Sequence, residues 1–305
     1  MDHKNILALI LILALLVPAS GSMAAANSYL TSGVEGDAKL AENVNLFLNG
    51  IEYKEYLPLI FGPEDKVYVP AGMFTMWCDP AHNGGFSCES DELPLDPIYL
   101  DAYYIDRYEV TNANYKECVT AGGCKAPFSF SSASHDSYYD NPIYADYPVI
   151  WVDWYSAHNY CIWAGKRLPT EAEWEKAARG AADTRPYPWG DEKPNCLLAN
   201  SFNEDGLSLC IGDTSQVGSH PNGASPYGAL DMAGNVYEWV NEPYQSNYYS
   251  TSQTSNSIDS ASGNYEVLRG GSWYSYWVNL RVTYRYYYPA GSSNAGVGFR
   301  CAASP

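Results

Sequence analysis

The 305-residue sequence is poor in basic residues. Lys and Arg together number 17 against 35 Asp and Glu, so the formal net charge at pH 7 is −18. A protein that binds the phosphates of nucleic acid needs a basic stripe on its surface. The charge balance therefore argues against nucleic acid as a partner, whereas an acidic surface favours solubility and suits divalent cations.

Long hydrophobic runs are also missing, with one exception near the start. The apolar run Ile6 to Val17 follows Lys4 and precedes the mostly small residues Ala19 to Ala26, which is the layout of a secretory signal peptide. The run is short of the roughly 20 apolar residues that a permanent membrane span needs. We predict a signal peptide at 1–26, a lead-in or linker at 27–65, and a secreted protein without a stable membrane span after cleavage. An uncleaved anchor is the alternative.

Spacings typical of metal or nucleophile sites are absent as well. The histidines after residue 26 are scattered, and no CxxC pair, HExxH or GxSxG motif occurs. These absences argue against zinc sites, CxxC redox chemistry and serine hydrolysis. Those histidines are His82, His135, His158 and His220.

Cysteine, in contrast, is well represented. All eight cysteines lie after residue 65, and an even count in an exported chain indicates disulfides. Spacing alone leaves many pairings open. Three pairs would each close a short loop: Cys78 with Cys88, Cys118 with Cys124, and Cys196 with Cys210.

Capping residues and apolar spacing predict an α+β chain without an internal repeat. Strands are expected within 67–76, around a turn, and within 98–105. Three helices are expected, each beginning after a capping residue: Thr111 before a helix to about Val119, Asp153 before 154–164, and Thr170 with Glu173 before 171–179. The segment Ser246 to Gly263 is predicted to be a surface loop.

Eight blocks of sequence resemble the formylglycine-generating enzyme (sulfatase-modifying factor) family. They occur in the family's order and span about 66–302: Val69–Met76, Tyr108–Asn112, Pro148–Trp154, Ala164–Glu175, Tyr187–Asp191, Tyr227–Trp239, Arg269–Trp273 and Gly298–Cys301. The resemblance implies one domain over 66–305 with the formylglycine-generating-enzyme fold, a loop-rich variant of the C-type lectin fold. It also implies a disulfide between Cys161 and Cys301.

The resemblance does not extend to the family's catalytic cysteines. Family enzymes oxidise a substrate cysteine with two thiolates that follow the Gly-Gly-Ser block and hold copper. Here the segment Tyr274–Arg281 contains no cysteine, and few other side chains suit Cu(I). Copper is therefore not expected. Another branch of the family binds iron through histidines, but the histidines of this sequence are not clustered. A non-catalytic protein is the main hypothesis, and a metal-dependent oxidase with relocated ligands is the alternative.

The resemblance implies structural calcium instead. The family's loop around Gly-Asn-x-x-Glu-Trp binds Ca²⁺ through oxygen atoms, which calcium prefers. A second family site lacks its acidic ligand near Leu209, and Asp213 is a candidate replacement. The alternative is that the Asn caps a turn and the Glu pairs with an arginine. The implied ligands are Asn235, Glu238 and the carbonyls of Val236 and Val240 in the first site, and Asn200 with the carbonyl of Ser201 in the second.

The segment 273–294 is rich in Tyr, Ser and Asn, the composition of adaptable binding loops. Some family members are ligand-binding proteins that diversify this segment. We predict that it binds a protein or another surface ligand, although with 28 tyrosines in the chain some of them must belong to the core. Because neighbouring side chains of a strand alternate between faces, at least one of Tyr286, Tyr287 and Tyr288 should be exposed. The candidate contacts are Tyr274, Ser275, Tyr276, Asn279, Tyr286, Tyr287, Tyr288, Ser293 and Asn294.

Overall fold

The computed structural model describes residues 65–245 and 264–305. The predicted signal peptide, the lead-in and the predicted loop Ser246 to Gly263 lie outside the described residues. Within the described ranges, no helix combines the length and the apolar character needed to cross a membrane.

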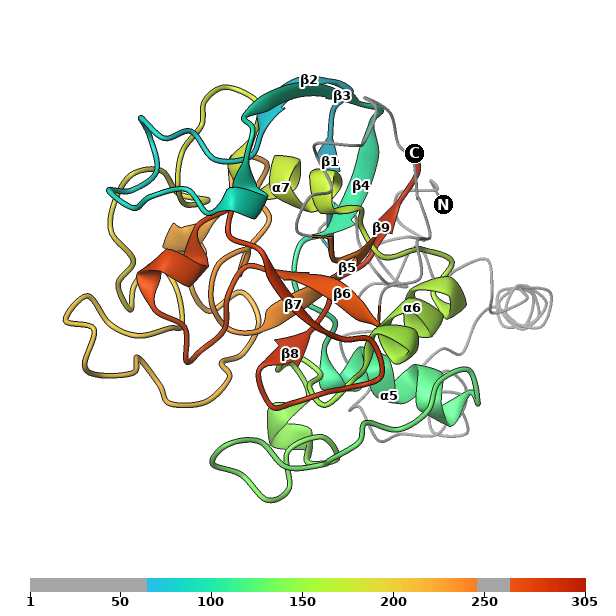
Figure 1. The fold of residues 1–305 in the computed structure, drawn as a ribbon. Coiled ribbons are helices and arrows are strands. Elements are labelled where there is room, and N and C mark those ends of the chain that lie inside the picture. Colours follow the sequence, from blue (N-terminus) through green and yellow to red (C-terminus); the bar gives the residue numbers. More distant parts are fainter. Residues whose placement is uncertain (1–64, 246–263) are drawn as a thin grey trace, which may run out of the picture. The chain divides into compact units, whose positions relative to one another are not determined.

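Short strands and three helices form three small sheets with long connections (Figure 1). One sheet has the order β1-β4-β9, the second pairs β2 with β3, and the third has the order β7-β6-β5-β8. The third sheet is antiparallel except for the parallel pair β5 and β8. The strands are β1 Lys66–Val69, β2 Gly72–Met76, β3 Asp96–Leu100, β4 Tyr103–Asp106, β5 Tyr237–Pro243, β6 Tyr265–Arg269, β7 Tyr286–Pro289, β8 Val297–Gly298 and β9 Ala302–Ala303; the helices are α5 Asn112–Thr120, α6 Trp154–Trp163 and α7 Glu171–Arg179.

The helices begin where their capping residues predict. The Thr111 hydroxyl accepts from the Asn114 N–H at 3.2 Å, and the Asp153 carboxylate accepts from the Ser156 N–H at 2.8 Å. Thr170 and Glu173 form the expected reciprocal capping box of α7. These bonds satisfy backbone donors that a helix leaves free in its first turn. The α+β prediction is therefore confirmed at the level of its helices.

The strand prediction needs one correction. The segment 98–105, expected as one β-rich stretch, is divided into β3 and β4. The reason is that β3 pairs with β2, whereas β4 pairs with β1 and β9 in a different sheet. Because the two strands belong to different sheets, the extended segment is interrupted between them.

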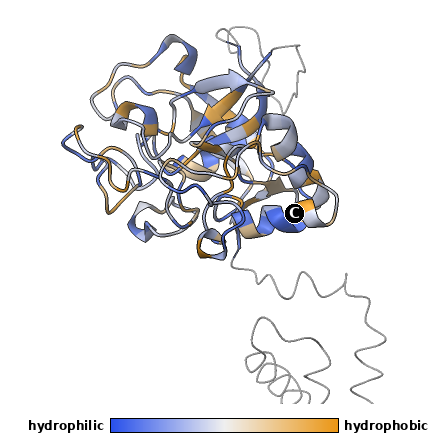
Figure 2. Cartoon of the chain, turned by 90° about the horizontal axis from the view of Figure 1, so that it is seen from below, coloured by the Kyte–Doolittle hydropathy of each residue, from blue (hydrophilic) through white to orange (hydrophobic). Residues whose placement is uncertain are grey.

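The centre of the third sheet, in β5 and β6, is covered on both faces. On β5, Trp239 packs with α5 and α6, and its neighbour Val240 packs with α7. On β6, Leu268 is likewise in the cluster with α5 and α6, and Val267 is in the cluster with α7. This is the alternation that a pleated strand imposes. Figure 1 shows α7 on one side of β5 and β6 and the other two helices on the opposite side, and in Figure 2 hydrophobic and hydrophilic residues alternate along the ribbon.

Every cysteine is in a disulfide. The pairs are Cys78–Cys88, Cys118–Cys124, Cys161–Cys301 and Cys196–Cys210, and no cysteine is free. The Cys161–Cys301 bridge joins α6 to the residue before β9, 140 positions along the chain. All four predicted pairings are therefore present.

Candidate functional site

Four exposed tyrosines lie next to one another around the edge strand β7. Tyr265, Tyr274, Tyr286 and Tyr287 have exposed fractions of 45%, 39%, 39% and 44%. The Tyr287 ring centroid lies 6.0 Å from that of Tyr286 and 5.5 Å from that of Tyr265. The Tyr274 hydroxyl donates to the Asn294 side chain at 3.5 Å. We call these four residues the tyrosine surface, and the prediction that Tyr286–Tyr288 includes an exposed ring is confirmed.

The rings of the tyrosine surface are held by others that sit deeper. Tyr286 stacks on the buried Tyr237 with 5.1 Å between ring centroids, and Tyr287 stacks on Tyr244 at 4.1 Å. Burial, with Tyr286 and Tyr288 nearby, raises the pKa of Tyr274. The Tyr274 phenol is therefore neutral at pH 7, so it offers a partner hydrogen bonds and apolar contact without charge.

Other residues of the predicted contact set have different surroundings. Ser275 is buried, and its hydroxyl accepts from the Ser272 N–H at 2.9 Å, so it orders a turn and is not accessible to a ligand. Tyr276 is exposed but stacks on Phe202, at 4.3 Å between centroids. Half-buried positions make up the rest of the set: Asn279, Tyr288, Ser293 and Asn294.

The Tyr274 side chain is fitted closely to its surroundings. A Cβ atom at Gly296 would lie 2.3 Å from a carbon of the Tyr274 ring, so a larger residue there would displace the ring. The Asn294 side chain accepts from the Gly296 N–H at 2.8 Å. Tyr265, in contrast, was not among the sequence candidates, because it lies outside 273–294 and joins the tyrosine surface only through the pairing of β6 with β7.

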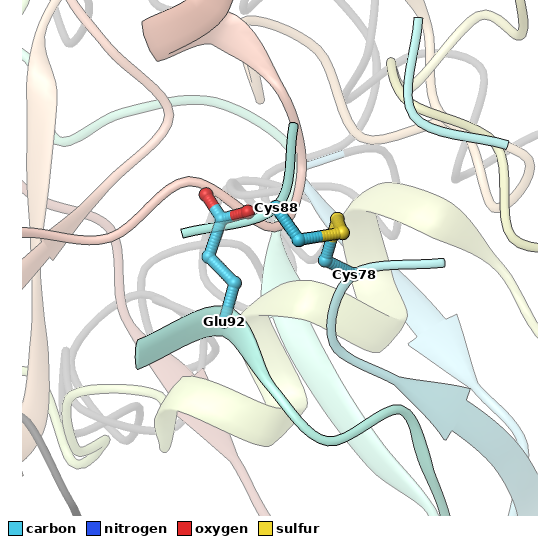
Figure 3. A group of neighbouring side chains, drawn as sticks. All are labelled: Cys78, Cys88 and Glu92. Atoms are coloured by element: carbon cyan, nitrogen blue, oxygen red, sulfur yellow. A yellow bond between two sulfur atoms is a disulfide. The ribbon is translucent and has the colours of Figure 1, made fainter. Parts of the chain in front are cut away.

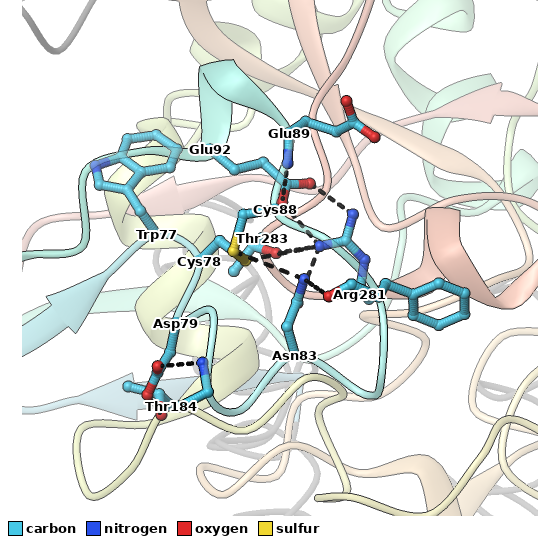
Figure 4. Close-up of a disulfide and its surroundings, with 12 residues drawn as sticks. Trp77, Cys78, Asp79, Asn83, Cys88, Glu89, Glu92, Thr184, Arg281 and Thr283 are labelled. Carbon is cyan, nitrogen blue, oxygen red and sulfur yellow. Dashed lines mark hydrogen bonds and ion pairs between the residues drawn. A yellow bond between two sulfur atoms is a disulfide. The ribbon is translucent and has the colours of Figure 1, made fainter.

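The segment that replaces the family's cysteine pair ends in a buried arginine. Arg281 binds both carboxylate oxygens of Glu92, at 2.8 and 2.7 Å, and donates to Asn83 at 2.9 Å (Figure 4). Its guanidinium also approaches the Cys78 sulfur at 4.0 Å. Arg281 thus anchors this segment to the 78–92 region and supplies no group for oxygen chemistry.

Among the described residues, one group of His, Cys, Asp or Glu side chains is tight enough for a metal ion: Cys78, Cys88 and Glu92 (Figure 3). The two sulfur atoms are bonded to each other, and the carboxylate is taken by Arg281. With these bonds in place the group has no free ligand atom. It therefore does not supply the relocated thiolates that the oxidase alternative requires.

Glu238, Asn235 and the Val240 carbonyl, implied as first-site calcium ligands, have hydrogen-bond donors of their own. The Glu238 carboxylate binds Arg300 through both oxygens, at 2.7 Å each, and accepts from the Trp174 indole at 2.8 Å. The Val240 carbonyl accepts from the Trp154 indole at 2.8 Å. Asn235 has a φ of 61° and accepts from the Ser215 N–H at 2.8 Å, which is a turn-ordering role. Val236 lies in a buried apolar cluster.

The second implied calcium site, unlike the first, has oxygen atoms that are free to bind a cation. Two buried oxygen atoms, Asn200 Oδ1 and Glu109 Oε1, have no hydrogen-bond donor in the part of the chain that the structure describes. Both side chains bond to the Asn235 amide, Asn200 at 3.3 Å and Glu109 at 2.9 Å. Acceptor oxygens without donors are costly when buried, and a cation satisfies them. The Ser201 carbonyl accepts from the Cys210 N–H at 2.9 Å.

Acidic side chains gather at the same place. Glu109, Asp231 and Glu238 are buried around the single guanidinium of Arg300. Burial, with Asp231 and Glu238 nearby, holds the pKa of Glu109 well above its usual range, and burial raises the pKa of Asp231 to about 6. The free oxygens of Asn200 and Glu109 are of the kind that Ca²⁺ prefers. Sequence reasoning missed Glu109 and Asp231, although both lie inside recognised blocks.

Asp213, the candidate replacement for the missing acidic ligand, is held by several hydrogen bonds. Its carboxylate accepts from the hydroxyls of Ser132 and Ser134, both at 2.6 Å, and from the Thr214 N–H at 2.8 Å. These donors lower the pKa of Asp213 despite its burial. Asp213 therefore fixes the loop that contains Ser132 and Ser134.

Known proteins resemble this chain over its described part. The serine/threonine-protein kinase pkn1 of Chlamydia caviae is 36% identical over 262 residues, which cover 78% of this chain and 38% of the kinase. This chain thus spans well under half the length of that relative. The formylglycine-generating enzyme of Thermomonospora curvata is 32% identical over 295 residues, covering 78% of this chain and 93% of the enzyme.

The fold agrees with these sequence relatives. The structure of PvdO from Pseudomonas aeruginosa superposes with a TM-score of 0.64 and 29% identity, covering 79% of this chain and 94% of PvdO. The expected α+β fold of the formylglycine-generating-enzyme type is therefore confirmed. The family described as the sulfatase-modifying factor enzyme 1-like domain matches residues 61–305, and this chain belongs to it.

Proposed function

We propose that this chain is an extracytoplasmic, non-catalytic domain that binds a protein partner through the tyrosine surface. The observation that carries the proposal is the exposure of Tyr265, Tyr274, Tyr286 and Tyr287, each more than a third exposed, with the Tyr287 ring in contact with those of Tyr265 and Tyr286. Large aromatic rings with polar tips are favoured at the centres of protein interfaces. The rings beneath them limit their motion, so binding costs little side-chain entropy.

Two further features support the proposal. The segment where the family enzymes hold copper contains tyrosines and the buried Arg281, and it contains no thiol. The four disulfides suit an oxidising compartment, as expected for an exported protein.

The test compares the wild type with a variant carrying Tyr286→Ala and Tyr287→Ala. A partner is captured from the native extracellular fraction, identified by mass spectrometry and then measured as a purified protein. We expect the variant to keep its melting temperature within a few degrees and to lose about 2 kcal/mol or more of binding free energy. Tyr99→Ala is the matched control, because Tyr99 is also exposed but lies on β3, away from the third sheet.

Unchanged affinity in the Tyr286/Tyr287 variant would contradict the proposal. The catalytic alternative is tested separately, by incubating the protein with copper, oxygen and a peptide that contains Cys-x-Pro-x-Arg. We expect mass spectrometry to recover the peptide unmodified, since no thiolate pair is present to hold copper. Copper-dependent loss of mass at the peptide cysteine would establish the oxidase instead.

We also propose that calcium stabilises the fold near Asn200, Asn235 and Glu109. The unpaired oxygens of Asn200 and Glu109 and the surplus of buried carboxylates support this position. Bound calcium would supply positive charge and order the loop-rich region around it. Its role in this proposal is structural.

A further inference from the structure

The rings of Tyr244 and Tyr287 are in direct contact. Their centroids lie 4.1 Å apart with 25° between the ring planes, the closest approach of two tyrosine rings in the part of the chain that the structure describes. At this separation, carbon atoms of the two rings are in van der Waals contact. Tyr244 directly follows β5 and Tyr287 lies in β7, and β6 is between these two strands in the sheet.

The Tyr244 hydroxyl has a proton acceptor. It donates to the Asp91 carboxylate at 2.8 Å, and Asp91 lies in the short 3-10 helix η2 Ser90–Glu92. Arg285 lies 3.8 Å from the same carboxylate oxygen. Burial and the bond to Asp91 raise the pKa of Tyr244, so the phenol keeps its proton at pH 7. A carboxylate at hydrogen-bond distance can take that proton as an electron leaves the ring, and the product is then a neutral phenoxyl radical.

The pair is also accessible to an oxidant. Tyr287 is 44% exposed, and Tyr244 is half-buried. Tyr115 and Tyr160, in contrast, stack at 5.5 Å between centroids but are both buried. Close ring contact, exposure and a proton acceptor therefore coincide at Tyr244 and Tyr287.

Tyr68 and Tyr104 form a second exposed pair, which provides an internal comparison. Tyr68 is 52% exposed, and the two ring centroids lie 5.4 Å apart. No carboxylate of the described residues accepts from either hydroxyl. This pair is thus as accessible as the first but lacks its close contact and its proton acceptor.

We propose that Tyr244 and Tyr287 are a site of oxidative cross-linking. A ring carbon of Tyr244 next to the hydroxyl-bearing carbon joins the equivalent carbon of Tyr287 in a dityrosine bond. The oxidant is hydrogen peroxide acting through a haem peroxidase, which removes one electron at a time. The bond ties the end of β5 to the edge strand β7, two strands that do not pair with each other.

The electrons and protons of this step balance. Each phenol gives one electron to the peroxidase and one proton, from Tyr244 to Asp91 and from Tyr287 to water. The two radicals form the carbon–carbon bond, after which each bonded carbon loses its hydrogen as a proton and each phenol oxygen regains one. In total, two electrons and two protons leave the pair and reduce one hydrogen peroxide to two waters.

The test treats the purified full chain, at low protein concentration, with horseradish peroxidase and limiting hydrogen peroxide. We expect a monomeric product that is lighter by two hydrogen atoms and has dityrosine fluorescence. Tandem mass spectrometry of its peptides should locate the bond between Tyr244 and Tyr287, ahead of any bond between Tyr68 and Tyr104. A monomer without dityrosine, or a bond located first at another pair, would overturn the proposal.

Conservative variants test the role of each group. Tyr244→Phe and Tyr287→Phe should each abolish the bond, because phenylalanine has no hydroxyl proton to lose. Asp91→Asn, which removes the proton acceptor, should slow bond formation at least about tenfold. Tyr265→Phe is the matched control and should leave the bond in place, because Tyr265 contacts Tyr287 from the other side of the pair at 5.5 Å.

Melting temperatures are measured first, so that rates are compared only between folded proteins. Loss of the bond in Tyr265→Phe would assign it to Tyr265 and contradict the proposal. An unchanged rate in Asp91→Asn would exclude Asp91 as the proton acceptor and remove the reason for choosing Tyr244. The proposed binding of a partner is not needed for any of these results.

Discussion

Glu109 shows how one residue can decide the fit of a whole site. It lies in the Tyr-Glu-Val-Thr-Asn block, is 2% exposed, and has one carboxylate oxygen without a donor in the described chain. Glu238, the acid that the family resemblance implies, is neutralised by Arg300. Glu109 and Glu238 are both buried glutamates, and what distinguishes them is the side chains that bind their carboxylates. Those side chains come from distant parts of the sequence.

The first prediction concerns Glu109 and calcium. Wild type should melt higher in millimolar Ca²⁺ than in EDTA, because an ion that binds only the folded state stabilises it by about 2.7 kcal/mol at a hundredfold excess over its Kd. Glu109→Gln should remove most of this difference and should melt no lower than wild type in EDTA. Differential scanning calorimetry checks it, with the exposed α5 residue changed in Glu117→Gln as control. Equal wild-type melting temperatures in EDTA and Ca²⁺ would end the calcium proposal.

The second prediction concerns Glu266, which pairs with Tyr288 across β6 and β7. Burial raises the pKa of Glu266 from 4.5 to about 7. The folded state therefore binds this proton more tightly than the unfolded state, and the associated stability is present below about pH 4.5 and lost as the pH rises through about 7.

Glu266→Gln should consequently stabilise the protein at pH 8 and change little at pH 4.5. We expect a gain on the order of 1 kcal/mol, reduced by solvent screening because Glu266 is only half-buried. Urea denaturation at the two pH values measures it, and Glu204→Gln at an exposed loop position is the control. A gain of equal size at both pH values would show that ionisation of Glu266 is not the cause.

At the scale of elements, α7 is unusual because its buried face is charged. Glu175 accepts from Arg269 at 2.6 Å, and Glu171 accepts from Arg285 at 2.7 and 3.0 Å. Glu175 also accepts from the Trp77 N–H at 2.8 Å. Charged side chains are rarely buried unless paired, and here the ion pairs attach α7 to the end of β6 and to the residue before β7.

The third prediction is that single changes in this network are severe. Arg269→Met leaves Glu175 as a buried charge without its main partner, so we expect a loss of about 3–5 kcal/mol in the free energy of unfolding. Arg185→Met removes a partly exposed ion pair with Asp183 and should cost less than about 1 kcal/mol. Chemical denaturation compares the two variants.

Combining Arg269→Met with Glu175→Gln tests the origin of that loss. If the cost comes from the unpaired carboxylate, the double variant should lose less than the sum of the two single variants. Additive losses would mean that the two side chains stabilise the protein independently.

At the scale of the whole molecule, Cys161–Cys301 closes most of the domain into one loop. The fourth prediction is that replacing both cysteines by Ala lowers the free energy of unfolding by roughly 3–5 kcal/mol, because the bridge restricts the unfolded chain. Replacing Cys118 and Cys124, which are 6 positions apart, should cost about 2 kcal/mol by the same argument. Urea denaturation of both variants gives the comparison, and a larger loss from the short loop would contradict the chain-entropy account.

Much of the architecture follows from signals that act over a few residues. The caps at Thr111, Asp153 and Thr170 each act within three positions, and the helices begin where they indicate. The split between β3 and β4 was missed because it depends on which strand each one pairs with. Pairing partners are set by the whole chain and leave little local trace.

The sequence by itself determined the family resemblance, the helix starts and the absence of a cysteine pair after Ser272, and it suggested the three short-loop cysteine pairs. Tertiary structure alone decided that Tyr265 joins the tyrosine surface, that Ser275 turns inward and that Arg300 takes Glu238. The physical reason is the distance along the sequence between the residues that interact. Caps and short loops depend on neighbouring residues, whereas burial and ion pairing depend on side chains that are tens to hundreds of positions apart until the chain folds; Glu238 and Arg300, for example, are 62 positions apart.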